Sequence, residues 1–308
     1  MPDQTPERRF ATGLVFAIAA YGLWGLMPVF FATLAPAGAV EIVAWRIVLS
    51  LVFCVLLLTA TRGWRALITI LRNRRTVLVM GLAGLFIVVN WLVYVYATVS
   101  NHVVEASLGY FTNPIVTVLL GVIVLRERLR VMQWVAIGFS ALAVLVLAVN
   151  YGQFPWIALT LALSFGLYGF IKKQVGGTVD AVSGLTLETA WLAPAAGIAL
   201  GVIAANGGLV AGTISTAHTL LVLSAGIVTA VPLLFFASAA RRLPLVYLGL
   251  TQYLAPVIQF LFGVFLFKEE MPLARWMGFA LVWIALIVLT VDMLRNNRAL
   301  RRTSLEAR

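Results

Sequence analysis

The sequence contains few charged side chains. Only 11% of its 308 residues are Asp, Glu, Lys or Arg, whereas 62% are apolar, and the mean hydropathy is +1.03. A soluble domain carries about 25% charged residues. Uncharged apolar stretches recur along the whole chain, and about 20 such residues form a helix long enough to cross a bilayer core of about 30 Å. The composition excludes a water-soluble enzyme and predicts an all-α polytopic membrane protein.

Residues that carry chemistry are also scarce. The single cysteine, Cys54, excludes an intrachain disulfide and a CxxC motif. The two histidines, His102 and His218, do not form an HExxH pair, and none of the three lysines follows a GxxxxG loop. We therefore expect no metal site, no cofactor and no ATP hydrolysis through a P-loop.

Ten windows are apolar and long enough to be membrane spans. They are roughly residues 13–34, 42–61, 76–98, 103–125, 131–149, 155–171, 181–204, 219–240, 245–267 and 273–291. The first window could instead be a signal peptide, but its apolar region exceeds the 7–15 residues typical of signals. We interpret it as a retained helix.

The net charge of +11 reflects topology rather than nucleic-acid binding. All Lys and Arg residues except Arg46, Lys268 and Arg275 lie in alternate connections or at the ends of the chain. Positively charged connections face the cytoplasm. This pattern predicts an even number of spans, a cytoplasmic N-terminus (1–12), and a basic cytoplasmic tail (295–308).

An internal repeat divides the chain. At a spacing of 142 residues, the pairs Pro114/Pro256, Gly121/Gly263, Glu127/Glu269 and Trp134/Trp276 match in register. The two halves, 13–149 and 155–294, would each contain five spans. Because five is odd, the second half enters the membrane in the opposite sense, which is the inverted-repeat arrangement of many secondary transporters. The repeat therefore predicts a 5+5 fold in which a substrate binds near the bilayer midplane and alternating access moves it.

Several motifs resemble the RarD-type branch of the EamA transporters, in the drug/metabolite transporter superfamily. They are AYGLWGL at 20–26, Glu41 and Arg46, NW at 90–91, NHVVEASLGY at 101–110, NP at 113–114, RERL at 126–129 with QW at 133–134, PW at 155–156, SFGLYG at 164–169, and QY at 252–253 with Pro256 and QF at 259–260. The resemblance spans residues 13–291. It implies ten helices and a permease in the bacterial cytoplasmic (inner) membrane that exports or exchanges a small metabolite, an amino-acid-like compound or a drug.

Ionisable groups inside a bilayer are costly, so Arg46, Glu105 and Glu188 are functional candidates. Arg46 and Glu105 lie at similar depth in the outer half of the membrane, which predicts that they form an ion pair. The residues equivalent to Arg46 and Glu105 in the second repeat, 142 positions later, are Glu188 and Tyr247. The repeat therefore predicts contact between Glu188 and Tyr247 in the inner half, with Lys172 or Lys173 as the other partner of Glu188. These contacts would be static latches or moving gates, or Glu188 would carry a coupled proton.

Polar and aromatic residues at comparable depth are expected to line the substrate cavity and to suit a small amphipathic solute. They are Tyr21, Trp24, Asn90, Trp91, Tyr94, Tyr110 and Asn113 in the first half, and Tyr168, Glu188, Trp191, Gln252, Tyr253 and Gln259 in the second. Pro114 and Pro256 are expected to kink the fourth and ninth spans. Glu127 and Glu269 precede the fifth and tenth spans, where carboxylates favour helix N-termini.

Two other classes of protein remain as alternatives. A passive channel or lipid scramblase would also be a multi-span protein. Saturable counterflow would distinguish a carrier from both of them. A polytopic membrane enzyme would need a buried nucleophile or paired aspartates, but Asp292 lies singly at the end of the last span. A homodimer through the fifth or tenth span is left open, as are the substrate and the coupling ion.

Overall fold

The computed structural model describes residues 6–125, 129–150, 154–175, 178–240, 242–243, 247 and 251–306. All regular secondary structure in these ranges is helical. The elements are α1 (Pro6–Ala32), α2 (Ala39–Ala60), α3 (Trp64–Leu71), α4 (Arg74–Val99), α5 (Val103–Leu125), α6 (Val131–Asn150), α7 (Trp156–Val175), α8 (Ala181–Ala205), α9 (Thr216–Ala240), α11 (Leu254–Leu261), the π-helix η1 (Phe262–Leu266) and α12 (Leu273–Glu306).

Seven of the described helices are long and apolar enough to cross a membrane: α1, α2, α4, α5, α8, α9 and α12. Three shorter apolar segments, Val131–Leu147, Trp156–Lys172 and Leu254–Leu266, coincide with the fifth, sixth and ninth predicted spans. Each predicted span therefore has a helical counterpart, and the total of ten crossings stays a prediction.

The outer surface is apolar, whereas ionisable groups are buried inside. Large apolar side chains such as Phe265 and Ile123 are more than 70% exposed, while Arg46 and Glu188 are 6% and 1% exposed. Water would penalise such a surface, but lipid does not. The chain is a multi-pass membrane protein.

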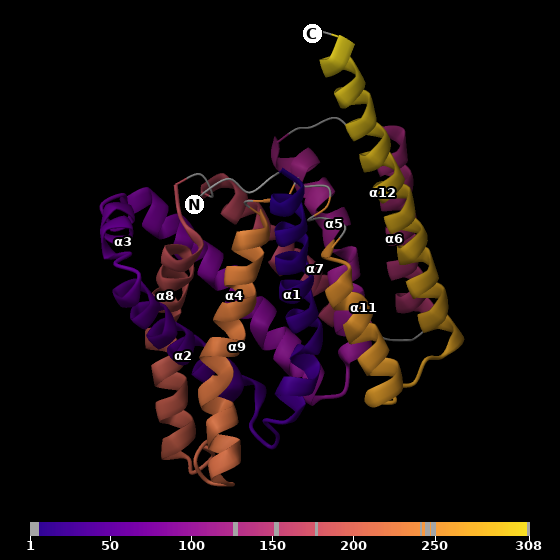
Figure 1. Ribbon diagram of the computed structural model, residues 1–308. Helices are drawn as coiled ribbons and strands as arrows, with labels where there is room; N and C mark the ends of the chain where they lie inside the picture. The colour runs from indigo at the N-terminus through magenta and orange to yellow at the C-terminus, as the bar shows by residue number, and fades with distance from the viewer. Residues whose placement is uncertain are drawn as a thin grey trace.

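The helices pack in a layered bundle (Figure 1). α2 packs against α8 and α9, α1 against α9 and α11, and α7 against α4 and α5, while α6 and α12 lie side by side at one edge. Glycines permit close approach of the helix backbones. A Cβ at Gly109 would lie 2.7 Å from the Ala158 carbonyl oxygen, and one at Gly226 would collide with the backbone of Leu49.

α1 begins and α12 ends at the same end of the bundle, where α12 extends beyond its neighbours (Figure 1). Because α12 continues to Glu306, the basic segment from Arg295 is helical to that residue. One end of the bundle therefore carries both the start of α1 and this basic extension.

The two repeated prolines have different surroundings. Pro114 lies near the middle of α5, as predicted. Pro256 lies in the first turn of α11, after turn residues Gln252 and Tyr253. Since proline has no N–H, it cannot donate to the carbonyl of Gln252 four residues earlier. The ninth span is therefore interrupted here rather than continuously helical.

Candidate functional site

Arg46 is the central residue of the candidate site. It projects from α2, and its Nε donates a hydrogen bond to Thr229 Oγ1 on α9 at 2.8 Å. The guanidinium carbon lies 4.3 Å from the ring centroid of Trp91 and 5.1 Å from that of Phe31. Its Nη1 is buried without a hydrogen-bond partner. Two aromatic faces and one hydroxyl thus hold the guanidinium and leave one of its donor nitrogens unused.

Further polar groups face this guanidinium. The hydroxyls of Tyr94 and Tyr110 are close enough to interact with it electrostatically. The Gln259 side chain, from α11, lies beside the Tyr94 hydroxyl. The Tyr94 hydroxyl and Gln259 Oε1 are nevertheless both buried without a hydrogen bond of acceptable geometry. We call the side chains around Arg46, namely Phe31, Trp91, Tyr94, Tyr110, Thr229 and Gln259, the Arg46 cage.

Asn90 joins three helices beside the cage. Its Nδ2 donates to the Leu161 carbonyl and to Ser164 Oγ on α7, both at 3.2 Å. Its Oδ1 accepts a hydrogen bond from the Tyr110 hydroxyl of α5 at 2.9 Å. The amide group thereby orients Tyr110 toward the guanidinium.

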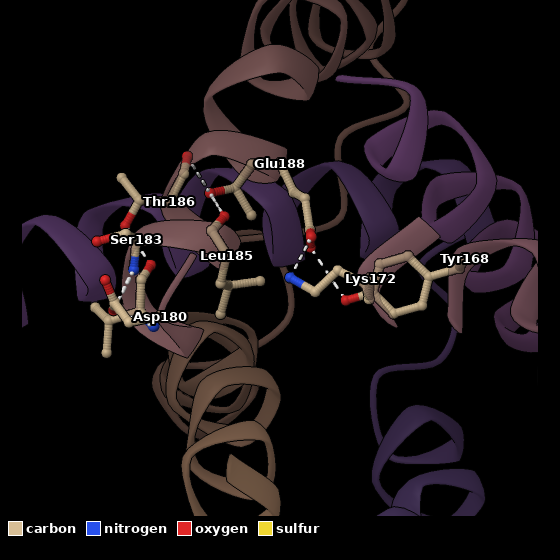
Figure 2. Close-up of polar contacts among 9 residues, drawn as sticks. Tyr168, Lys172, Asp180, Ser183, Leu185, Thr186 and Glu188 are labelled. Atoms are coloured by element: carbon tan, nitrogen blue, oxygen red, sulfur yellow. Dashed lines mark hydrogen bonds and ion pairs between the residues drawn. The ribbon is translucent and has the colours of Figure 1, made fainter. Parts of the chain in front are cut away.

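A second buried charge cluster connects α7 and α8 (Figure 2). Lys172 Nζ donates to Glu188 Oε1 at 2.8 Å, and the Tyr168 hydroxyl donates to Glu188 Oε2 at 3.2 Å. The predicted contact of Glu188 with Lys172 is therefore confirmed, and the side chain of Lys173 lies outside the described residues. The predicted contact with Tyr247 is wrong, because Tyr247 packs edge-on against Phe10 of α1. Tyr168 takes that place, since it lies one helical turn before Lys172 on the same face of α7.

A chain of aromatic rings connects the two clusters. Neighbouring centroids in the series Phe31, Tyr94, Tyr110, Phe165 and Tyr168 are 6.0, 5.4, 5.8 and 6.0 Å apart. The series begins at the Arg46 cage and ends at the Glu188 cluster. A continuous row of aromatic side chains therefore lies in the interior between Arg46 and Glu188.

Glu105 does not pair with Arg46 in this structure, so that prediction is wrong. Its carboxylate faces the backbone N–H groups of Ile157 and Ala158 in the first turn of α7. Such a position is favourable because helix N-termini attract negative charge. Glu105 also lines a cavity of about 70 Å³ together with His102 and Arg275.

Glu269 stabilises a different helix from the one expected. Its carboxylate accepts hydrogen bonds from the N–H groups of Val103 and Val104 and thereby caps α5 instead of α12. Burial raises the pKa of the Glu269 carboxyl, and these N–H groups together with Arg275 counteract the rise. Glu127, its counterpart in the repeat, lies outside the described residues.

The other predicted cavity residues are dispersed. Tyr21 and Trp24 pack on each other and on Phe236. Asn113 is buried, and its Oδ1 has no partner. Tyr253 lies against Gln252 and Thr290 of α12 rather than against the cage. Trp191 is 49% exposed and packs over Gly81 of α4, so its place in the cavity stays a prediction.

Four residues of the interior were not predicted: Phe31, Ser164, Phe165 and Thr229. Each lies in an apolar span, where a single Phe, Ser or Thr has the same sequence signature as an ordinary packing residue. Only the orientation of the helices identifies them as neighbours of Arg46, Asn90 or Tyr168.

The groups around Arg46 suit binding of a small solute. They offer one cation, several aromatic faces, hydroxyls and an amide, which is the composition of a typical ligand site. Within the described ranges, no three His, Cys, Asp or Glu side chains come together as a set of metal ligands.

Comparison with known proteins finds relatives that match over nearly the whole chain. The EamA-like transporter family matches residues 11–149. Protein RarD from Streptomyces exfoliatus is 50% identical over 98% of this chain and 95% of its own length. An uncharacterized transporter from Vibrio cholerae is 38% identical over 98% of both chains, and protein RarD from Escherichia coli (strain K12) is 38% identical over 93% of this chain and 96% of its own. A solved crystal structure matches with a TM-score of 0.57 at 19% identity, covering 92% of this chain and 98% of that one, which shows likeness of fold.

Proposed function

The chain belongs to the RarD-type EamA transporters, and from this premise we propose that it is a secondary transporter that works by alternating access. Its substrate would be a small metabolite, an amino-acid-like compound or a drug, and its location the bacterial cytoplasmic membrane. The observation that carries the proposal is the bond between Arg46 of the first half and Thr229 of the second. A buried polar contact between two half-bundles is expected where a substrate binds and where the halves move apart.

Helix packing supports an inverted 5+5 repeat. If α1, α2, α4, α5 and α6 correspond to α7, α8, α9, α11 and α12, the contacts fall into equivalent pairs. The contact of α1 with α9 corresponds to that of α7 with α4, α2 with α9 to α8 with α4, and α5 with α7 to α11 with α1. α2 and α8 pair with each other, as do α6 and α12. This is the pattern of a pseudo-two-fold axis, about which one half can rock against the other.

The two charge clusters would act as gates at different depths. The Arg46 cage connects α2 with α9 and α11, whereas the Lys172–Glu188 pair connects α7 with α8. The proline of α5 and the break before α11 offer sites where helices could bend as gates open. Opening of one cluster while the other stays closed would expose the solute to each side in turn.

The orientation and assembly of the protein are parts of the same proposal. The common end of α1 and α12 would face the cytoplasm, because the basic connections gather on that side by the charge rule. A homodimer through α6 or α12 stays a prediction.

Counterflow in proteoliposomes tests the function. Purified protein would be reconstituted with a panel of metabolites inside, and uptake of each labelled compound would be followed with and without a proton gradient. A carrier gives saturable uptake that is accelerated by the same compound on the opposite side. Uptake that does not saturate and shows no acceleration would indicate a channel or scramblase and contradict the proposal.

A further inference from the structure

Arg46 is a buried cation without a counter-anion among the residues that the structure describes. The ion pairs there join Arg130 to Asp292, Lys172 to Glu188 and Arg275 to Glu269, and none involves Arg46. Glu105, the carboxylate predicted to pair with Arg46, instead faces the first turn of α7, and Glu188 binds Lys172.

An unpaired buried charge is unfavourable unless something compensates for it. In Arg46 the compensation is partial: Thr229 binds Nε, two rings cover the guanidinium, and Nη1 remains free. A site that keeps a desolvated guanidinium with an unused donor is preorganised for an anion.

Two neighbouring groups strengthen this interpretation. The Tyr94 hydroxyl is a second donor that is buried without a partner, and it belongs to the same cage. The aromatic series that starts at Phe31 would contact an apolar body attached to the anionic group.

We infer that the substrate carries a carboxylate next to an aromatic or aliphatic body, and that Arg46 binds this carboxylate through Nη1 with help from the Tyr94 hydroxyl. The inference rests on the proposed function and specifies its substrate class. Since Thr229 holds Arg46 across the two halves, carboxylate binding would also change the contact that joins them.

Equilibrium binding of radiolabelled phenylacetate and hexanoate to the purified full-length protein in detergent tests the inference. Unlabelled phenylacetamide, hexanamide, phenethylamine and phenylphosphonate serve as competitors. We expect at least one carboxylate to bind and its amide to compete roughly ten- to hundredfold more weakly, which is the loss expected when a bond to a charged group is removed. Competition by phenylphosphonate more than tenfold tighter than by phenylacetate would overturn the assignment to a carboxylate.

Variants identify the residue responsible. Arg46→Met should abolish carboxylate binding, and Arg46→Lys should weaken it, because lysine keeps the charge but cannot form the planar contact. Tyr94→Phe removes only a hydroxyl, so it tests the site even if Arg46→Met fails to fold, and it should weaken carboxylate binding about three- to tenfold. The control is Arg242→Met: Arg242 also lies over a ring, that of Phe16, but its Nη1 already donates to the Ser238 carbonyl. This control should bind as the wild type does.

Absence of binding by both carboxylates, equal affinity for acid and amide, or unchanged affinity in both Arg46→Lys and Tyr94→Phe would overturn the inference. A counterflow experiment distinguishes failure of this inference from failure of the proposed transporter function. Saturable counterflow of neutral solutes that does not depend on Arg46 contradicts only the inference. Binding that depends on Arg46 without any counterflow contradicts only the transporter proposal.

Discussion

The side-chain amide of Gln259 donates a hydrogen bond to the backbone carbonyl of Trp24 at 3.2 Å, and so connects α11 to α1. Pro28, four residues after Trp24 in the same helix, has no N–H to offer this carbonyl. A glutamine from the other half of the chain thus replaces a helical hydrogen bond that a proline removes, as happens in membrane interiors where water is absent.

This relationship predicts the result of a double-mutant cycle. Gln259→Leu should lower the free energy of unfolding by about 1–2 kcal/mol, because it leaves the Trp24 carbonyl buried and unsatisfied. In the Pro28→Ala background the helix supplies its own donor, so the same substitution should cost less. Thermal unfolding of the four proteins in detergent measures the difference. An equal cost in both backgrounds would show that Gln259 does not act through this carbonyl.

Thr229→Val should slow counterflow, because it removes the acceptor that holds Arg46 across the two halves. Thr219→Val is a matched control on the same helix. Both threonines donate to the carbonyl four residues earlier, at 2.8 and 3.0 Å, but only Thr229 also binds Arg46. We expect about a tenfold loss of initial rate for Thr229→Val, from a bond worth about 1.5 kcal/mol, and none for Thr219→Val. Equal rates in the two variants would exclude a role of this bond in transport.

Glu188→Gln tests whether this carboxylate carries a coupled proton. If it does, the variant should lose the dependence of substrate flux on a pH gradient and retain exchange, because glutamine cannot release a proton. Glu270→Gln changes an exposed carboxylate in the loop before α12 and should leave the dependence intact. Uptake driven by a pH gradient in Glu188→Gln at the wild-type level would refute proton coupling at this residue and leave the pair with Lys172 as a latch or gate.

Gly226→Ala should destabilise the protein, because the new methyl group would collide with the backbone of Leu49 where α9 crosses α2. Overpacking of this kind costs about 1–3 kcal/mol. Gly197→Ala, in α8, is the control, since a Cβ there would meet nothing within 4 Å. Alanine in a helix is also more stable than glycine by about 0.5–1 kcal/mol. Gly197→Ala should therefore be as stable as the wild type or more stable. Melting temperatures in detergent rank the stabilities of the two variants. A lower melting temperature for Gly197→Ala than for Gly226→Ala would contradict the prediction.

The positions of the apolar helices, and the side chains that would be costly in lipid, follow from the amino-acid sequence. Each predicted span coincides with a helix or a shorter apolar segment, since burial in hydrocarbon requires about twenty uncharged helical residues. The contact of Lys172 with Glu188 could also be predicted, because the two residues lie toward the same end of adjacent spans.

The direction in which each helix face points follows only from the packing of the folded protein. Arg46 and Glu105 were expected at similar depth, yet one meets Trp91 and Thr229 and the other faces the first turn of α7. Translation of that pair by the repeat suggested Tyr247 for Glu188, whereas Tyr168 lies on the facing side of α7. The physical reason is that sequence position sets the depth of a residue at 1.5 Å per residue, while rotation of a helix about its axis is set by packing against its neighbours.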